Sequence, residues 1–124
     1  MDYSFKSLKV YQMSYELAMD IFEITKSFPK EEKYSLTDQI RRSSRSVCSN
    51  LAEAYRKRRY PKSFTSKISD ADGEASETVV WINFSYDCKY INEEIKERLL
   101  KKYEEVGKML GGMANNPEKF LPKQ

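Results

Sequence analysis

The sequence contains no histidine among its 124 residues. Histidine is the side chain whose ordinary pKa suits proton transfer near neutral pH, so its absence excludes Ser-His and Cys-His catalytic arrangements and histidine-ligated metal sites. The two cysteines, Cys48 and Cys88, are too few for a zinc site made of cysteine alone and too far apart for a CxxC redox motif. We therefore expect two buried thiols in a reducing compartment, no metal, no cofactor and no enzymatic activity.

Glycine, proline and long apolar runs are also scarce. Four glycines and four prolines form neither a GxGxxG nor a GxxxxGK motif, so the sequence predicts no phosphate-binding glycine loop. The longest apolar run, 79–82, has four residues, far fewer than the roughly 20 needed to cross a bilayer. Asp2, Lys6 and Lys9 stand where a signal peptide would be apolar. We expect no membrane association and a cytoplasmic location.

Apolar residues recur at helical spacing along most of the chain. Val10, Leu17 and Ile24 stand seven residues apart, as in the stripe of a bundle helix. Similar stripes predict helices over about 7–28, 36–58, 61–90 and 93–114, with a short tail over 117–124. Four helices joined by short loops favour an all-α, antiparallel up-and-down four-helix bundle. Since the length is that of one domain, we assign residues 1–124 to a single domain.

Residues that start and stop helices set these boundaries. Phe28 precedes a proline and is therefore pushed out of the helical region. Ser35 and Asn92 are expected to cap the second and fourth helices, and Pro61 suits a first helical position. Gly73 lies inside the third helix, where glycine costs about 1 kcal/mol relative to alanine. We expect a close helix contact to offset that cost.

Positive charge is concentrated in one part of the chain. The formal net charge is only +3, yet positions 41–67 hold nine cations and a single acid, Glu53. In the turn between the second and third helices, Tyr55, Tyr60 and Phe64 interleave the cations and could offer stacking surfaces to unpaired bases. The predicted phosphate contacts, to RNA or DNA and without sequence readout, are Arg56, Lys57, Arg58, Arg59 and Lys62.

Two other interpretations of these charges stay open. The cluster can be a solvated helix end that stabilises backbone carbonyls and keeps the protein in solution, or it can bind an acidic protein. The three arginines at positions 41, 42 and 45 can either extend the basic surface or pair internally. Glu74 and Glu77 face the same way in the third helix, and we expect them to pair with one of these arginines rather than to bind a metal.

Small polar residues are unusually frequent in the second helix. Serine is a mediocre helix former, so we expect the stretch to permit a close helix contact with a polar network formed by Ser46, Ser49, Asn50 and Glu53. A catalytic serine is disfavoured because neither a histidine nor a Ser-x-x-Lys motif accompanies it.

Tyrosine is abundant, with nine residues. We expect Tyr11, Tyr15, Tyr34 and Tyr86 to exceed what one small bundle can bury. Such residues are typical of subunit contacts, although half-buried tyrosines on a monomer remain an alternative.

Several motifs resemble one known family over about residues 5–113. The chain opens with Phe5-x-x-Leu8-x-Val10-Tyr11-Gln12 and ends the match with Lys108-Met109-Leu110-Gly111-Gly112. The most specific run is Ser46-Val47-x-Ser49-Asn50-Leu51-Ala52-Glu53-Ala54. These residues resemble the 23S rRNA intervening-sequence, or S23-type, proteins. Ala54 departs from the family pattern, which has glycine there, and the family's third-helix motif is only loosely matched over 73–78.

The resemblance implies a left-handed bundle that assembles into a homopentameric ring. One branch of the family comprises the accessory variability determinants of diversity-generating retroelements, which are pentamers that bind nucleic acid and a reverse transcriptase. The resemblance therefore implies a homo-oligomer and RNA, DNA, a reverse transcriptase or another protein as partner. The alternative function is a protein assembly scaffold with no nucleic-acid role.

Overall fold

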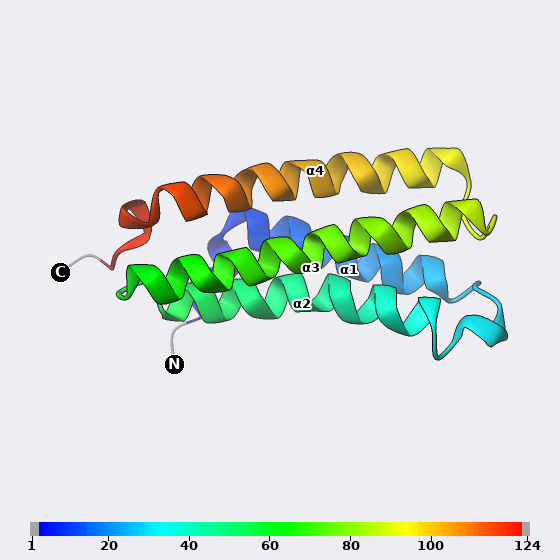
Figure 1. Cartoon of the computed structure of the whole chain (residues 1–124), viewed down its shortest axis with the longest axis horizontal. Coiled ribbons are helices and arrows are strands. Elements are labelled where there is room, and N and C mark those ends of the chain that lie inside the picture. The colour runs from blue at the N-terminus through cyan, green and yellow to red at the C-terminus, as the bar shows by residue number, and fades with distance from the viewer. Residues whose placement is uncertain (1–2, 123–124) are drawn as a thin grey trace.

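The computed structural model describes residues 3–122, so the first and last two residues of the expected domain lie outside the described residues. Its elements are η1 (Ser4–Ser7), α1 (Lys9–Thr25), η2 (Lys30–Glu32), α2 (Leu36–Arg56), α3 (Pro61–Asp87), α4 (Glu93–Asn115) and η3 (Pro117–Phe120), where η denotes a 3-10 helix. The four α-helices alternate in direction, and each packs against two others around the bundle (Figure 1). The predicted all-α, up-and-down four-helix bundle is confirmed.

The predicted apolar stripes form the core. Val10 and Leu17 of α1 are buried, as are Ile40 and Val47 of α2 and Ile82 of α3. Burying an aliphatic side chain of this size stabilises the fold by roughly 1.5–3 kcal/mol. The heptad spacing thus places one continuous apolar face of each helix against the others.

The first helix is shorter than the predicted 7–28. Leu8 has an extended backbone, with ψ 128°, and this separates η1 from α1. After Thr25 the backbone amides of residues 26–28 bond to carbonyls three residues earlier, so the chain tightens before Pro29. The apolar pattern continued through these tighter turns and concealed where the α-helix ends.

The third helix ends at Asp87 rather than at the predicted residue 90. Lys89 has a positive φ of 67°, the amide of Tyr90 donates to the Ser85 carbonyl, and the amide of Lys89 donates to the Tyr86 carbonyl. This is the Schellman arrangement that terminates many helices, here with lysine where glycine is common. The other ends lie closer to expectation, since α2 stops two residues early and α4 one residue late.

The predicted caps have mixed outcomes. Pro61 is the first residue of α3, and Asn92 accepts a 2.8 Å hydrogen bond from the Ile95 amide. Ser35 occupies the cap position of α2, but its side chain does not cap the helix. Its hydroxyl instead donates to Oε1 of Glu32 at 2.6 Å, because that carboxylate lies one turn upstream and is the stronger acceptor.

The expected close contact at Gly73 is wrong. A Cβ atom at this position would meet nothing within 4 Å, and the residue is exposed. The structure gives no account of glycine here.

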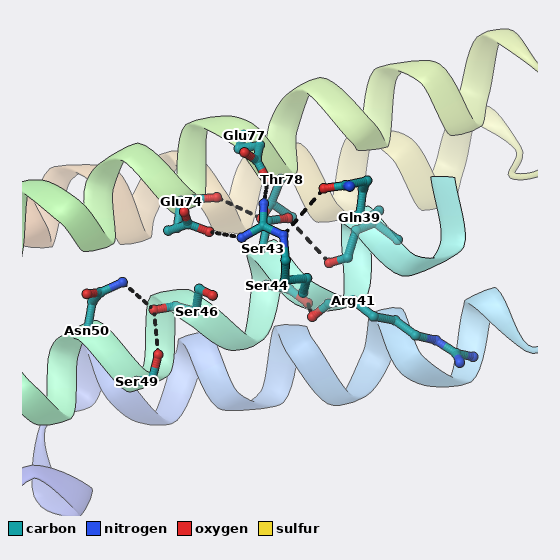
Figure 2. Close-up of polar contacts among 12 residues, drawn as sticks. Gln39, Arg41, Ser43, Ser44, Ser46, Ser49, Asn50, Glu74, Glu77 and Thr78 are labelled. Carbon is teal, nitrogen blue, oxygen red and sulfur yellow. Dashed lines mark hydrogen bonds and ion pairs between the residues drawn. The ribbon is translucent and has the colours of Figure 1, made fainter. Parts of the chain in front are cut away.

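Close contact between α2 and α3 occurs instead at Ser43, which is fully buried together with Ser44 and Thr78. The hydroxyl oxygens of Thr78 and Ser43 are 2.8 Å apart across the two helices (Figure 2). The small residues of α2 thus permit the expected approach at 43 and 44.

Candidate nucleic-acid interface

The predicted phosphate-binding residues lie at the α2–α3 turn, at the end of the bundle that also holds both chain termini (Figure 1). We call Arg56, Lys57, Arg58, Arg59 and Lys62 the basic turn. Of these, Arg58 is half-buried and the other four are exposed. The geometry brings all five side chains to one end of the molecule, where several phosphates can be contacted together.

Arg58 has a structural part in this turn. Its Nη1 donates to the Tyr55 carbonyl at 2.8 Å, and its guanidinium lies 4.1 Å from the centre of the Tyr55 ring. These contacts satisfy a carbonyl at the C-terminal end of α2 and place positive charge where the helix dipole is negative. Arg58 therefore helps to form the turn.

The remaining charges of the basic turn are uncompensated. Among residues 3–122, no carboxylate lies within ion-pair distance of Arg56, Lys57, Arg59 or Lys62. Nearby Lys67 differs, because its Nζ lies 2.9 Å from Oε2 of Glu53 and this contact raises the lysine pKa. Lys57 and Lys62 also border a shallow cleft of about 270 Å³ with Ser63 and Ser66. The surface is suited to an anion with several phosphates.

The three aromatic residues of this region differ in exposure. Tyr60 is 66% exposed, whereas Tyr55 is half-buried beneath Arg58. Phe64 is fully buried, and its ring stacks on Phe120 with centres 5.5 Å apart. The expected stacking surface at Phe64 is therefore wrong, because the residue begins the buried stripe of α3. Of these three aromatic residues, Tyr60 is therefore the one whose ring is exposed for stacking.

Arg42 pairs internally, as expected for one of the three arginines. Its Nη1 lies 3.2 Å from Oε2 of Glu74, and its Nη2 pairs with Oε2 of Glu77. Arg41 extends from α2 toward α1, away from these carboxylates (Figure 2). The predicted pairing of Glu74 and Glu77 with an α2 arginine is confirmed.

The predicted polar network is divided between two sets of contacts. Ser49 Oγ and Asn50 Nδ2 both donate to the Ser46 carbonyl, at 3.2 and 2.9 Å, within α2 (Figure 2). Glu53 instead reaches α3 through its ion pair with Lys67. Of the four residues, Glu53 is the one whose bond in the described structure links two helices.

The exposed aromatic surface differs from the one that the sequence predicted. Tyr15 and Tyr34 are exposed by 53% and 84%, whereas Tyr11 and Tyr86 are half-buried. The sequence did not predict the exposure of Phe84, which is 53% exposed on α3. The centre of its ring lies 5.9 Å from that of Trp81. The unbroken apolar run just before it, at 79–82, was a signal that α3 carries more apolar surface than the core requires.

Cys88 corrects the prediction of two buried thiols. It is exposed, and Cys48 is partly buried, because Cys88 follows the last turn of α3, beyond the packed part of that helix. Within 3–122 there is no group of three or more cysteine, aspartate or glutamate side chains that could hold a metal. None of the helices in this range is both long and apolar enough to cross a bilayer.

Fold and surface together define a four-helix-bundle protein with a basic turn at one end. The model of the 23S rRNA-intervening sequence protein family matches residues 6–112. The chain belongs to this family.

The chain is also similar to a solved structure. This is a protein of unknown function from the S23 ribosomal protein family of Bacteroides thetaiotaomicron VPI-5482, with 29% identity and a TM-score of 0.77. The similarity covers 86% of this chain and 95% of the other. No curated protein matches the chain.

Proposed function

We propose that this protein is a non-enzymatic, oligomeric, cytoplasmic bundle that binds RNA or DNA through the phosphates, without reading sequence. The observation that carries the proposal is the set of four exposed cations of the basic turn that have no carboxylate partner among residues 3–122. Such charges repel one another, so a polyanion that releases its counterions on binding stabilises them. Sequence independence follows because flexible lysine and arginine side chains at a turn contact backbone phosphates rather than base edges.

Exposed apolar residues support the oligomeric part of the proposal. One patch, formed by Val80 and Phe84 of α3, is about half exposed. Such a patch suits a contact between subunits, because apolar surface that one chain leaves open is buried when copies associate. A ring of five is the number that the family resemblance implies.

The test is light scattering coupled to size exclusion, recorded at 260 and 280 nm in low and then high salt, on protein purified without nuclease. We expect an oligomer that carries nucleic acid in low salt and releases it in high salt. The test variant replaces Arg56, Lys57, Arg59 and Lys62 by glutamine and keeps Arg58, which the turn itself requires. The matched control replaces four other exposed lysines by glutamine, namely Lys30, Lys101, Lys102 and Lys108.

The test variant should lose the nucleic acid and keep its oligomeric mass, whereas the control should keep both. A clean oligomer whose 260 nm absorbance is indifferent to salt would contradict nucleic-acid binding. It would favour the scaffold alternative, in which the oligomer binds a protein such as a reverse transcriptase and no nucleic acid. A monomer would contradict the assembly.

A further inference from the structure

A second cleft lies along the first half of α2, separate from the basic turn. It has a volume of about 610 Å³, and its walls include Lys33, Tyr34, Thr37, Asp38, Arg41 and Arg45. Asp38 is the one acid among the described lining residues, against four cations when Arg42 is counted. Since Arg42 is held by Glu74 and Glu77, the positive character of the cleft rests on Arg41, Arg45 and Lys33.

Arg41 is fixed in place by neutral groups alone. Its Nε donates to Thr25 Oγ1 at 2.8 Å, its Nη2 donates to the Phe22 carbonyl at 3.3 Å, and its guanidinium lies 4.7 Å from the Phe22 ring centre. No carboxylate among residues 3–122 forms an ion pair with it. The group is therefore held in one position with its charge intact, which is the arrangement that lowers the ordering cost of binding an anion.

Arg45 adds a second such charge beside the first. Its guanidinium lies 5.7 Å from the centre of the same Phe22 ring, and it too has no ion pair within the described range. Like charges four residues apart on a helix destabilise it, and a bound anion reverses this effect.

The path from this cleft to the basic turn follows one face of α2. Arg45, Ser49, Ala52 and Arg56 are spaced by four, three and four residues, so they lie on one stripe. Arg45 and Arg56 are separated by about 16 Å along the helix axis, at 1.5 Å per residue. The two residues between them are small and form part of the α2 wall of an open, largely apolar groove of about 390 Å³, whose other lining residues include Phe5 and Tyr15. At 3.4 Å per nucleotide of stacked strand, this span corresponds to about five nucleotides.

We propose that Arg41 and Arg45 bind a phosphate of a single nucleic-acid strand that lies along α2 between this cleft and the basic turn. The inference rests on the proposed function and specifies its ligand as unpaired RNA or DNA. Arg45 and Arg56, at the two ends of one α2 stripe, form a single row that matches one backbone rather than the two of a duplex. An exposed tyrosine stands at each end of the row, since Tyr34 at the cleft and Tyr60 at the turn are exposed by 84% and 66%. Unpaired bases stack on such rings, whereas paired bases cannot.

The test is fluorescence anisotropy with labelled oligouridylates of 4 and 12 nucleotides and with a 12-base-pair duplex, each at several salt concentrations. The variants are Arg45→Gln, which removes no hydrogen bond to any of residues 3–122, and the double variant Arg41→Gln/Arg45→Gln. Arg98→Gln on α4 is the control, because it removes the same charge at a residue that pairs with Asp20 and does not line the cleft. Circular dichroism establishes that each variant is folded.

We expect Arg45→Gln to weaken binding of the 12-mer by about threefold to tenfold. The salt slope of that binding should fall by about 0.7, the value for one phosphate contact in a single strand. The 12-mer should bind wild type far better than the 4-mer does, because it reaches both sites. The double variant should lose most of that gain. Arg98→Gln should change neither quantity, and the duplex should bind more weakly than the 12-mer.

The inference and the proposed function fail in different ways. If the basic-turn variant loses the 12-mer while Arg45→Gln and the double variant keep its affinity and salt slope, the strand path along α2 is wrong and the proposed function stands. If wild type binds no oligonucleotide at all, both are wrong. If the duplex binds as tightly as the 12-mer and Tyr34→Ala changes nothing, the assignment to a single strand is overturned.

Discussion

Arg42 in α2 is shared by Glu74 and Glu77 in α3, and Glu77 also accepts a 3.3 Å hydrogen bond from the indole nitrogen of Trp81. These contacts neutralise the middle one of three nearby arginines. They divide α2 into a side that is tied to α3 and a side on which Arg41 and Arg45 keep their charge. The same ion pairs thus stabilise the bundle and separate its structural arginine from the two that we assign to ligand binding.

Replacing Arg42 by alanine should destabilise the protein by about 0.5–1 kcal/mol, since the pair is partly exposed and solvent screens it. The measurement is urea unfolding followed by circular dichroism. In Glu77→Ala the same substitution should cost less, because one of its two partners is already gone. Equal costs in both backgrounds would show that Arg42 and Glu77 are not coupled. Oligonucleotide affinity should change less in Arg42→Ala than in Arg45→Gln.

The buried bond between α2 and α3 gives a second prediction. Thr78 and Ser43 are both fully buried, and Thr78 also donates to the Glu74 carbonyl at 2.8 Å. Thr78→Val should cost about 1–2 kcal/mol, because it leaves the Ser43 hydroxyl without this partner in an apolar setting. Ser43→Ala should cost less in the Thr78→Val background than in the wild type, since the bond between the two hydroxyls is already lost there. Strictly additive unfolding free energies would contradict the coupling.

Helical spacing predicted the bundle because each helix buries one apolar face, and burial depends on the spacing rather than on the partner. The same reasoning found the carboxylate pair that holds Arg42. It could not find the fixed position of Arg41, which depends on how α1 is rotated about its axis so that Phe22 and Thr25 face α2. The same spacing places Phe64 four positions before Ile68 on one stripe of the third helix, and both residues are buried. The stacking role inferred from the neighbouring cations was therefore the part that was wrong.

Helix ends were predicted less well than helix faces, because they depend on short-range competition among polar groups. The Ser35 hydroxyl, for example, bonds to the Glu32 carboxylate and does not cap the backbone amides of α2. At Lys89 the helix ends through a backbone conformation with positive φ. Glycine is the residue usually found in that conformation, so a search for glycine in the sequence does not find this helix end. The candidate site shows a similar difference. The concentration of charge in the sequence predicted the basic turn, but no sequence pattern predicted the second cleft.

A pH-dependent contact lies at the end of the bundle opposite the basic turn. The hydroxyls of Ser35 and Tyr90 both donate to the Glu32 carboxylate, at 2.6 and 2.8 Å, and lower its pKa below the ordinary 4.5. Because the folded protein favours the ionised form, this contact stabilises the fold above pH 4.5 and is lost as the pH falls through the lowered pKa.

Glu32→Gln should therefore reduce the stability measured at pH 7 and flatten its fall below pH 4.5. Glu31→Gln is the control, because that exposed neighbour does not receive the Tyr90 hydrogen bond. Identical pH profiles for wild type and Glu32→Gln would contradict the assignment. Tyr90 titration gives an independent readout, since donation to Glu32 raises its pKa to about 12 and Glu32→Gln should lower it.

Lys89→Gly should stabilise the protein by about 0.5–1 kcal/mol, because lysine is strained at a positive φ and glycine is not. Thermal or urea unfolding measures the change. The control is Asp87→Gly, two residues earlier in the last turn of α3, where glycine should be destabilising by a similar amount. Destabilisation by both substitutions would mean that the side chain of Lys89 contributes more than its backbone conformation costs.

The two cysteines should react with thiol reagents at very different rates. Cys88 is exposed after the last turn of α3, whereas burial raises the pKa of Cys48 to about 11. Since the thiolate is the reacting form, this pKa alone slows Cys48 about a hundredfold relative to a thiol with the ordinary value of 9.0. Labelling of the native protein at pH 8 should therefore show one fast and one slow thiol. Cys88→Ser should remove the fast phase and Cys48→Ser the slow one, and urea should make both fast in the wild type. Equal native rates would contradict the burial of Cys48, and with it the packing of α1 against α2 beside that residue.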